Sequence, residues 1–165
     1  MLNVVEDVRR DLINEVKELN DEQLNKKPAP EEWSINQVLI HLYKSEMLTL
    51  TTLKELITEA KDQKIEDKPV ELTVDRSKKR KAPDYLKPTD ESMEKQAVLE
   101  QLETSRKELA SFVENYPNQN SLHEKTLEHP VFGEMSIAQW IDCVGYHEKR
   151  HLIQIKEIKK TLSIS

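Results

Sequence analysis

The stretch SIAQWIDCVGYHEKRHLIQIKEIKKTL, residues 136–162, carries the clearest structural pattern in this 165-residue chain. Ser136 precedes the stretch's apolar residues and Gln139 follows three positions later, which is typical of a capping box at a helix start. The apolar residues then recur every three or four positions, which is the period of an amphipathic α-helix. They are Ile137, Trp140, Ile141, Val144, Leu152, Ile155 and Ile158. The stretch predicts one long helix that buries one face.

Three earlier segments show the same helical period and complete the set. Apolar stripes predict helices over about residues 3–20, from Ser34 to about residue 60, and from residue 89 or 90 to residue 116, where Pro117 ends the last of them. The second of these also begins with Ser-Ile-x-Gln, as the stretch at 136 does. The pattern therefore predicts an all-α fold in which four helices form a single domain over residues 1–165.

The connection between the second and third predicted helices is long. Residues 61–88 contain three prolines and many charges, and residues 70–74 fit a short strand or a helical turn. Loops of this length are uncommon in compact domains, so we expect a crossover that returns along the bundle and leaves the two helices parallel.

Composition excludes several classes of function. Only two glycines, Gly133 and Gly145, occur, so the glycine-rich dinucleotide and phosphate-binding loops and the G-x-S-x-G elbow are absent. Few glycines also disfavour tight hairpins. The net charge of −6 argues against nucleic-acid binding. The segment from Arg76 to Lys81 is the exception, with five basic residues in six. It fits a solvated loop, a site for an anionic substrate, or a contact with nucleic acid if the domain belonged to a regulator.

The single cysteine, Cys143, excludes an internal disulfide and a cysteine-rich zinc site, and we expect it to be buried. No run of 18 apolar residues is present, so we expect no membrane-spanning helix. No stretch near the first residue has the pattern of a signal peptide. These features together lead us to expect a cytoplasmic protein.

Two histidines within the 136–162 stretch could share a ligand. His147 and His151 are four residues apart, so both imidazoles lie on one helix face. They fit a metal site, a half-buried packed pair or a solvent-facing pair. The segment between them also matches H-E-x-x-H, but no histidine follows His151 to complete a zincin site, so we interpret Glu148 as a solvated residue beside Lys149 and Arg150.

A third ligand would have to come from earlier in the chain. His41 is the best candidate, because it lies two turns inside the second predicted helix at the edge of its apolar face. His123 and His129 fall in a loop, where their positions are less constrained. Spacing alone leaves open that His41 only packs within the bundle.

Three blocks of the sequence resemble the DinB/YfiT-like superfamily. They are WSINQVLIHL at 33–42, HPVFGEMS at 129–136 and the H-x-x-x-H-L-x-Q-I segment at 147–155. The resemblance implies an up-down-down-up four-helix bundle with a long crossover between helices two and three. It also implies one divalent ion per chain, zinc or nickel, bound by His41, His147 and His151.

The same resemblance implies a class of chemistry. The superfamily includes metal-dependent hydrolases and S-transferases that use low-molecular-weight thiols such as bacillithiol or mycothiol, and many of its members form homodimers. Three histidines leave a coordination position open, where a metal activates water or deprotonates a thiol. We therefore expect a hydrolase or S-transferase that acts on a small-molecule substrate, with catalytic residues unassigned. A non-catalytic metal-binding or sensing bundle and a helical interaction module remain as alternatives.

One departure from the thiol-transferase pattern bears on specificity. Glu46 stands where that branch often has a second histidine after His41. We interpret Glu46 as facing solvent, with an orienting role near the site as the alternative. Trp33, Tyr43 and Tyr146 fit either the mouth of the site or core packing.

Overall fold

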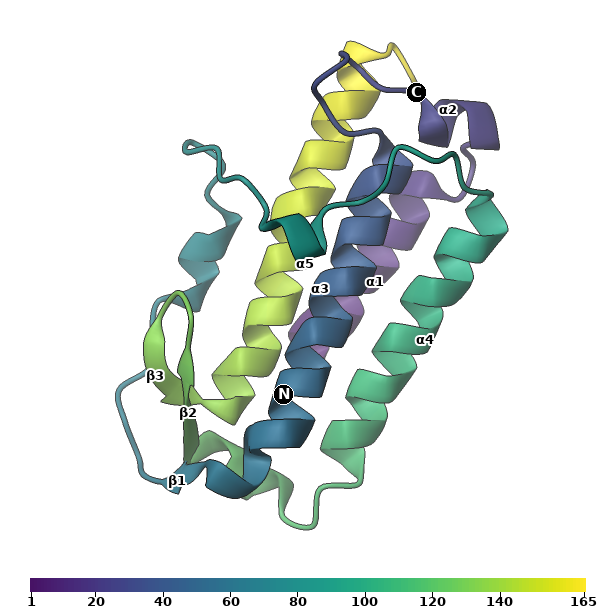
Figure 1. Ribbon diagram of the computed structural model, residues 1–165. Coiled ribbons are helices and arrows are strands. Elements are labelled where there is room, and N and C mark those ends of the chain that lie inside the picture. Colours follow the sequence, from purple (N-terminus) through teal and green to yellow (C-terminus); the bar gives the residue numbers. More distant parts are fainter.

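Four long helices lie side by side in the computed structural model, which describes residues 1–165 (Figure 1). Their bounds are α1 (Asn3–Val16), α3 (Ile35–Leu56), α4 (Lys95–Glu114) and α5 (Ile137–Thr161). The short helix α2 (Asp21–Asn25) and four 3-10 turns, at Ile57–Glu59, Val70–Val74, Asp84–Leu86 and Gln119–His123, complete the helical part. The predicted four-helix bundle is confirmed.

The predicted cap of α3 forms completely. The Ser34 hydroxyl accepts from the Gln37 amide at 3.1 Å, and the Gln37 side chain accepts from the Ser34 amide at 3.0 Å. Ser136 likewise accepts from the Gln139 amide at the start of α5. The Gln139 side chain, however, hydrogen-bonds both backbone groups of Lys68, at 2.9 and 2.8 Å. It therefore fastens the crossover to α5 instead of closing a second capping box.

Helix boundaries differ from the prediction where polar side chains capture the backbone. Asn20 forms its own capping box with Gln23, which starts α2 and separates it from α1. The third long helix begins at Lys95 rather than at residue 89 or 90, because side chains of α2 and α3 donate to the carbonyls of Thr89 and Met93 before it. Asn25 and Asn36 both donate to the Met93 carbonyl, at 2.9 and 2.8 Å. These bonds place the starts of α3 and α4 at the same end of the bundle (Figure 1).

A small sheet corrects the all-α prediction to a mostly helical one. The antiparallel strands β1 (Lys61–Asp62), β2 (Lys125–His129) and β3 (Gly133–Ser136) lie in that order at one end of the bundle (Figure 1). Gly133 adopts a φ of +72°, which lets the chain reverse between β2 and β3. The scarcity of glycine therefore did not prevent a hairpin, since this one needs a single glycine. β3 leads directly into α5 and fixes where that helix begins.

The core lies between the apolar faces of the long helices. α5 contacts α1, α3 and the 3-10 turn at Val70–Val74, whose first residue is buried. Gly145 lets α1 approach α5 closely, because a Cβ there would stand 2.8 Å from a methyl group of Val4. None of the helices is long and apolar enough to cross a membrane.

Candidate metal centre

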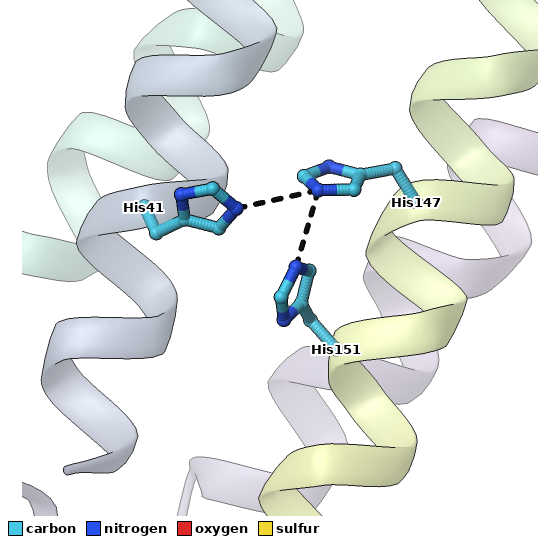
Figure 2. Close-up of side chains that lie close together, drawn as sticks. All are labelled: His41, His147 and His151. Atoms are coloured by element: carbon cyan, nitrogen blue, oxygen red, sulfur yellow. Dashed lines mark hydrogen bonds between the residues drawn. The ribbon is translucent and has the colours of Figure 1, made fainter. Parts of the chain in front are cut away.

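Three histidines meet between α3 and α5, and we call them the histidine triad (Figure 2). His41 extends from α3, while His147 and His151 extend from successive turns of α5. The Nε2 atom of His147 lies 3.3 Å from that of His41 and 3.1 Å from that of His151. One ring nitrogen from each of the three lies within 4.8 Å of the others. The structure thus brings together the three residues selected from the sequence.

Neighbouring oxygen atoms fix the orientation of two of these rings. His41 Nδ1 lies 3.0 Å from the Leu86 carbonyl, and His151 Nδ1 lies 2.7 Å from the Gln154 side-chain oxygen. Because these oxygens can only accept, each Nδ1 carries the proton and each Nε2 presents a lone pair. A proton on His147 Nε2 can serve only one of these two lone pairs, whereas a cation in place of that proton would be bound by the Nε2 atoms of all three rings.

The geometry fits a small divalent ion. Two nitrogens bound tetrahedrally at about 2.0–2.1 Å from zinc would lie roughly 3.3 Å apart. The observed separations of 3.3 and 3.1 Å match this edge length. Ring orientation by an outer hydrogen bond, as His41 and His151 show, is also typical of histidine ligands. The triad could therefore bind a metal ion.

Burial keeps the histidine triad uncharged. Loss of solvent lowers the pKa of His147 to about 3, and the charges of His41 and Arg150 add to this effect. Burial likewise lowers the pKa of His41 and His151, although the hydrogen bond to Leu86 partly offsets the effect at His41. At neutral pH the three rings are therefore neutral imidazoles, which is the form that binds metal.

The triad opens into a cleft of about 980 Å³, which we call the histidine cleft. Its aromatic lining is Trp33, Tyr85, Phe132 and Trp140. Trp33 also packs against His41, with ring centroids 5.0 Å apart. Tyr43 and Tyr146 instead pack against the two halves of the hydrophobic core. Of the three aromatic residues considered from the sequence, only Trp33 borders the site.

Four buried charges join the four long helices beside the triad, and we call them the charge cluster. Its members are Arg9 of α1, Glu46 of α3, Arg106 of α4 and Glu148 of α5. Each arginine pairs with both glutamates at 2.6–2.7 Å. Ser105 also donates to Glu46 at 3.0 Å. The two positive and two negative charges neutralise one another.

The charge cluster overturns two predictions. Glu46 and Glu148 were both expected to face solvent, but they are only 2% and 1% exposed. Sequence reasoning failed because it considered each glutamate with its neighbours in the chain, whereas the partners come from other helices. Glu148 is also not placed to act as the general base of an H-E-x-x-H site, because both of its carboxylate oxygens accept hydrogen bonds from Arg9 and Arg106.

The remaining candidate residues lie apart from the triad. His123 is exposed on a 3-10 turn, away from the histidine cleft. His129 ends β2 and lines the cleft, but its Nδ1 accepts from the backbone amide of Val131 at 3.1 Å. Cys143 is buried as predicted, and burial raises its pKa to about 12, so it is a protonated thiol at neutral pH.

The basic segment forms part of the wall of the histidine cleft. Arg76, Lys79, Arg80 and Lys81 all line it. Arg150 fastens this segment to α5, because its guanidinium donates to the carbonyls of Thr73, Asp75 and Lys78. The segment is exposed, as a solvated loop would be, but it is held beside His151.

Comparisons with known sequences show which family the chain belongs to. The family model described as the DinB superfamily matches residues 5–155. YuaE of Bacillus subtilis is 41% identical over 161 residues, which cover 98% of each chain. A protein of Oceanobacillus iheyensis named "Putative metal-dependent hydrolase OB0782" is 31% identical over 96% of this chain and 84% of its own length.

Solved structures share the same fold. YfiT from Bacillus subtilis, described as "a probable metal-dependent hydrolase with an unusual four-helix bundle topology", superposes with a TM-score of 0.64 at 18% identity, covering 99% of this chain and 86% of YfiT. TT2238, described as a four-helix bundle protein, gives the same TM-score at 21% identity over 94% of this chain and 95% of its own. With the family model spanning most of its length, the chain belongs to the DinB superfamily.

Proposed function

We propose that the protein binds one divalent ion, zinc or nickel, through His41, His147 and His151, and that it is a metal-dependent enzyme acting on small molecules. The observation that carries the proposal is the convergence of three neutral imidazoles on an open cleft, with the His147 Nε2 atom 3.3 Å from that of His41 and 3.1 Å from that of His151. The name of the Oceanobacillus iheyensis relative, "Putative metal-dependent hydrolase OB0782", supports the same interpretation.

The chain's own residues would hold the ion and shape its surroundings. Leu86 and Gln154 keep the protons of His41 and His151 on Nδ1, so both Nε2 atoms stay available as ligands. The charge cluster joins α3 to α5 beside the site and holds the two ligand-bearing helices at a fixed separation. A divalent ion with an open position lowers the pKa of a bound water or thiol and so supplies a nucleophile at neutral pH.

Glu46 narrows the choice of ligands. Its carboxylate oxygens accept from Arg9, Arg106 and Ser105. Glu46 is therefore not free to bind the ion as a fourth ligand. The protein would therefore supply three ligands and leave the rest of the coordination sphere to water or substrate. We propose hydrolysis or thiol transfer in general and assign no particular thiol as the substrate. The reason is that Glu46 occupies the position that is often histidine in the thiol-transferase branch.

We also propose that the four long helices follow an up-down-down-up order. The common end at which α3 and α4 begin supports this order, as does the long crossover between them. The order matters for function because it places the N-terminal half of α3, with His41, against the α5 histidines.

Turnover tests the proposal. Metal-stripped protein, reloaded with zinc or nickel, is assayed with an activated ester and, separately, with an electrophile in the presence of a small thiol. We expect activity above that of the free ion, and we expect His41→Ala to abolish it. His123→Ala is the matched control and should retain full activity, because His123 lies outside the cleft. Metal-loaded protein with no turnover in either assay would leave a non-catalytic metal-binding bundle as the function.

A further inference from the structure

The histidine cleft carries more positive than negative charge once ion pairs are taken into account. Its lining glutamates include Glu46 and Glu148, which the charge cluster neutralises, and Glu157, which Arg76 pairs at 2.9 Å. Only Glu31 and Glu32, both exposed before α3, remain unpaired.

Four positively charged side chains that line the cleft have no acidic partner. They are Lys79, Arg80, Lys81 and Arg150, all of which line the cleft and none of which forms an ion pair. Arg150 is the most constrained of them, with only 9% of its surface exposed. Its guanidinium donates to neutral backbone carbonyls and forms no direct ion pair, and Asp75 and Glu157 attract it only from a longer distance.

The positive charge of this wall contrasts with the net negative charge of the whole chain. The chain has a net charge of −6, yet unpaired cations collect on one wall of the cleft that holds the triad. Like charges held together without a counter-ion destabilise one another, and an anion in the cleft would relieve that cost. Arg150 binds the carbonyl of Lys78, so the three exposed cations that follow are held near α5 and do not drift with a free loop.

We propose that the histidine cleft binds a small organic anion, whose carboxylate or phosphate group lies against Lys79, Arg80 and Lys81 on the side of Arg150. The remainder of the molecule would then extend toward the histidine triad, between Trp33 and Tyr85. This inference rests on the proposed function in one respect, since it takes the cleft beside the triad as the substrate site.

The dimensions of the cleft favour a small ligand over a polymer. Pockets of roughly 300–1,000 Å³ enclose single small molecules, and the histidine cleft measures about 980 Å³. Its aromatic lining offers apolar contact next to the cationic wall. A ligand with one anionic end and one uncharged end fits both surfaces.

Calorimetric titration of the metal-free, full-length protein tests the proposal without any contribution from a metal. The probes are succinate and inorganic phosphate at low ionic strength, where screening is weakest. The test variant is Lys79→Gln/Arg80→Gln. The control is Arg10→Gln/Lys64→Gln, which removes the same charge from exposed residues outside the cleft.

We expect wild type to bind at least one probe, and the preferred probe identifies the anionic group as carboxylate or phosphate. The Lys79→Gln/Arg80→Gln variant should bind it about tenfold more weakly or worse, while the control stays within about twofold of wild type. Absence of binding to wild type, or an equal loss in the control, would overturn the proposal. Zinc binding is measured separately on a portion of each preparation that is reloaded with zinc, so a failure of the metal site is distinguished from a failure of anion binding.

Discussion

Replacing Arg9 by Met should destabilise the protein far more than the same change at Arg10. The two arginines are adjacent in α1, but Arg9 lies in the charge cluster with its side chain 9% exposed. The side chain of Arg10 is 65% exposed and forms a pair only with Asp7, one turn earlier. The two variants therefore separate the buried cluster from the general effect of losing an arginine.

The contacts of Arg9 set the magnitude. Its guanidinium donates to Glu148 at 2.6 and 3.0 Å, to Glu46 at 2.7 Å and to the Leu102 carbonyl at 2.6 Å. Arg9→Met leaves two buried glutamates with one arginine. Removing one partner of a buried ion pair costs about 3–5 kcal/mol, whereas an exposed pair contributes about 0–1 kcal/mol.

Urea unfolding followed by circular dichroism measures both variants. At about 2–4 °C per kcal/mol for a chain of this length, Arg9→Met should also lower Tm by roughly 6–20 °C, and Arg10→Met by no more than about 4 °C. If the two variants unfold within about 1 kcal/mol of each other, the charge cluster does not hold the helices together as we argue.

Three further predictions follow from burial. Burial lowers the pKa values of the histidine triad, so as the pH falls the unfolded chain takes up protons before the folded protein does. Metal-free protein should therefore lose stability as the pH falls below about 6.5, by up to about 1.4 kcal/mol per pH unit for each histidine. Urea titrations from pH 7.5 to 5 measure this loss, and a stability that does not change with pH would refute the prediction. Cys143, with its pKa raised to about 12, should react with iodoacetamide at pH 8 at least about a hundredfold more slowly in native protein than in urea, as mass spectrometry would show. Gly145→Ala should lower stability by about 1 kcal/mol despite the better helix propensity of alanine, since its Cβ would meet Val4 at 2.8 Å; an unchanged Tm would show that α1 can shift.

Local patterns predicted the bundle, and together with the family resemblance they predicted the triad. Helical periodicity located the four long helices, and Ser34 with Gln37 marked the start of α3. The i, i+4 spacing placed His147 and His151 on one face, while the choice of His41 depended on family resemblance. Each of these signals lies within a few residues of the chain or within a known motif.

Contacts between distant segments were not predictable in the same way. Gln139 was expected only to cap its own helix, but it binds Lys68 in the crossover. The β2–β3 hairpin depends on one glycine, Gly133, in a left-handed conformation, and a periodic pattern of apolar residues does not predict such a turn.

The charge cluster did leave a signal in the sequence. Arg9 falls between Val5 and Leu12 on the apolar stripe of α1, and Glu148 falls between Val144 and Leu152 on that of α5. Glu46 and Arg106 occupy equivalent stripe positions in α3 and α4. One charge on each apolar stripe, two of each sign, indicates mutual pairing at the centre of a bundle, because a lone buried charge would be prohibitively costly.

Metal content tests the central claim most directly. Wild type, His151→Ala and His123→Ala are purified alike, equilibrated with zinc or nickel, freed of unbound ion and analysed by mass spectrometry for metal per chain. We predict about one ion per chain in wild type and in His123→Ala, and loss of most of it in His151→Ala. Equal metal content in wild type and His151→Ala would contradict the assignment of the histidine triad as the metal site.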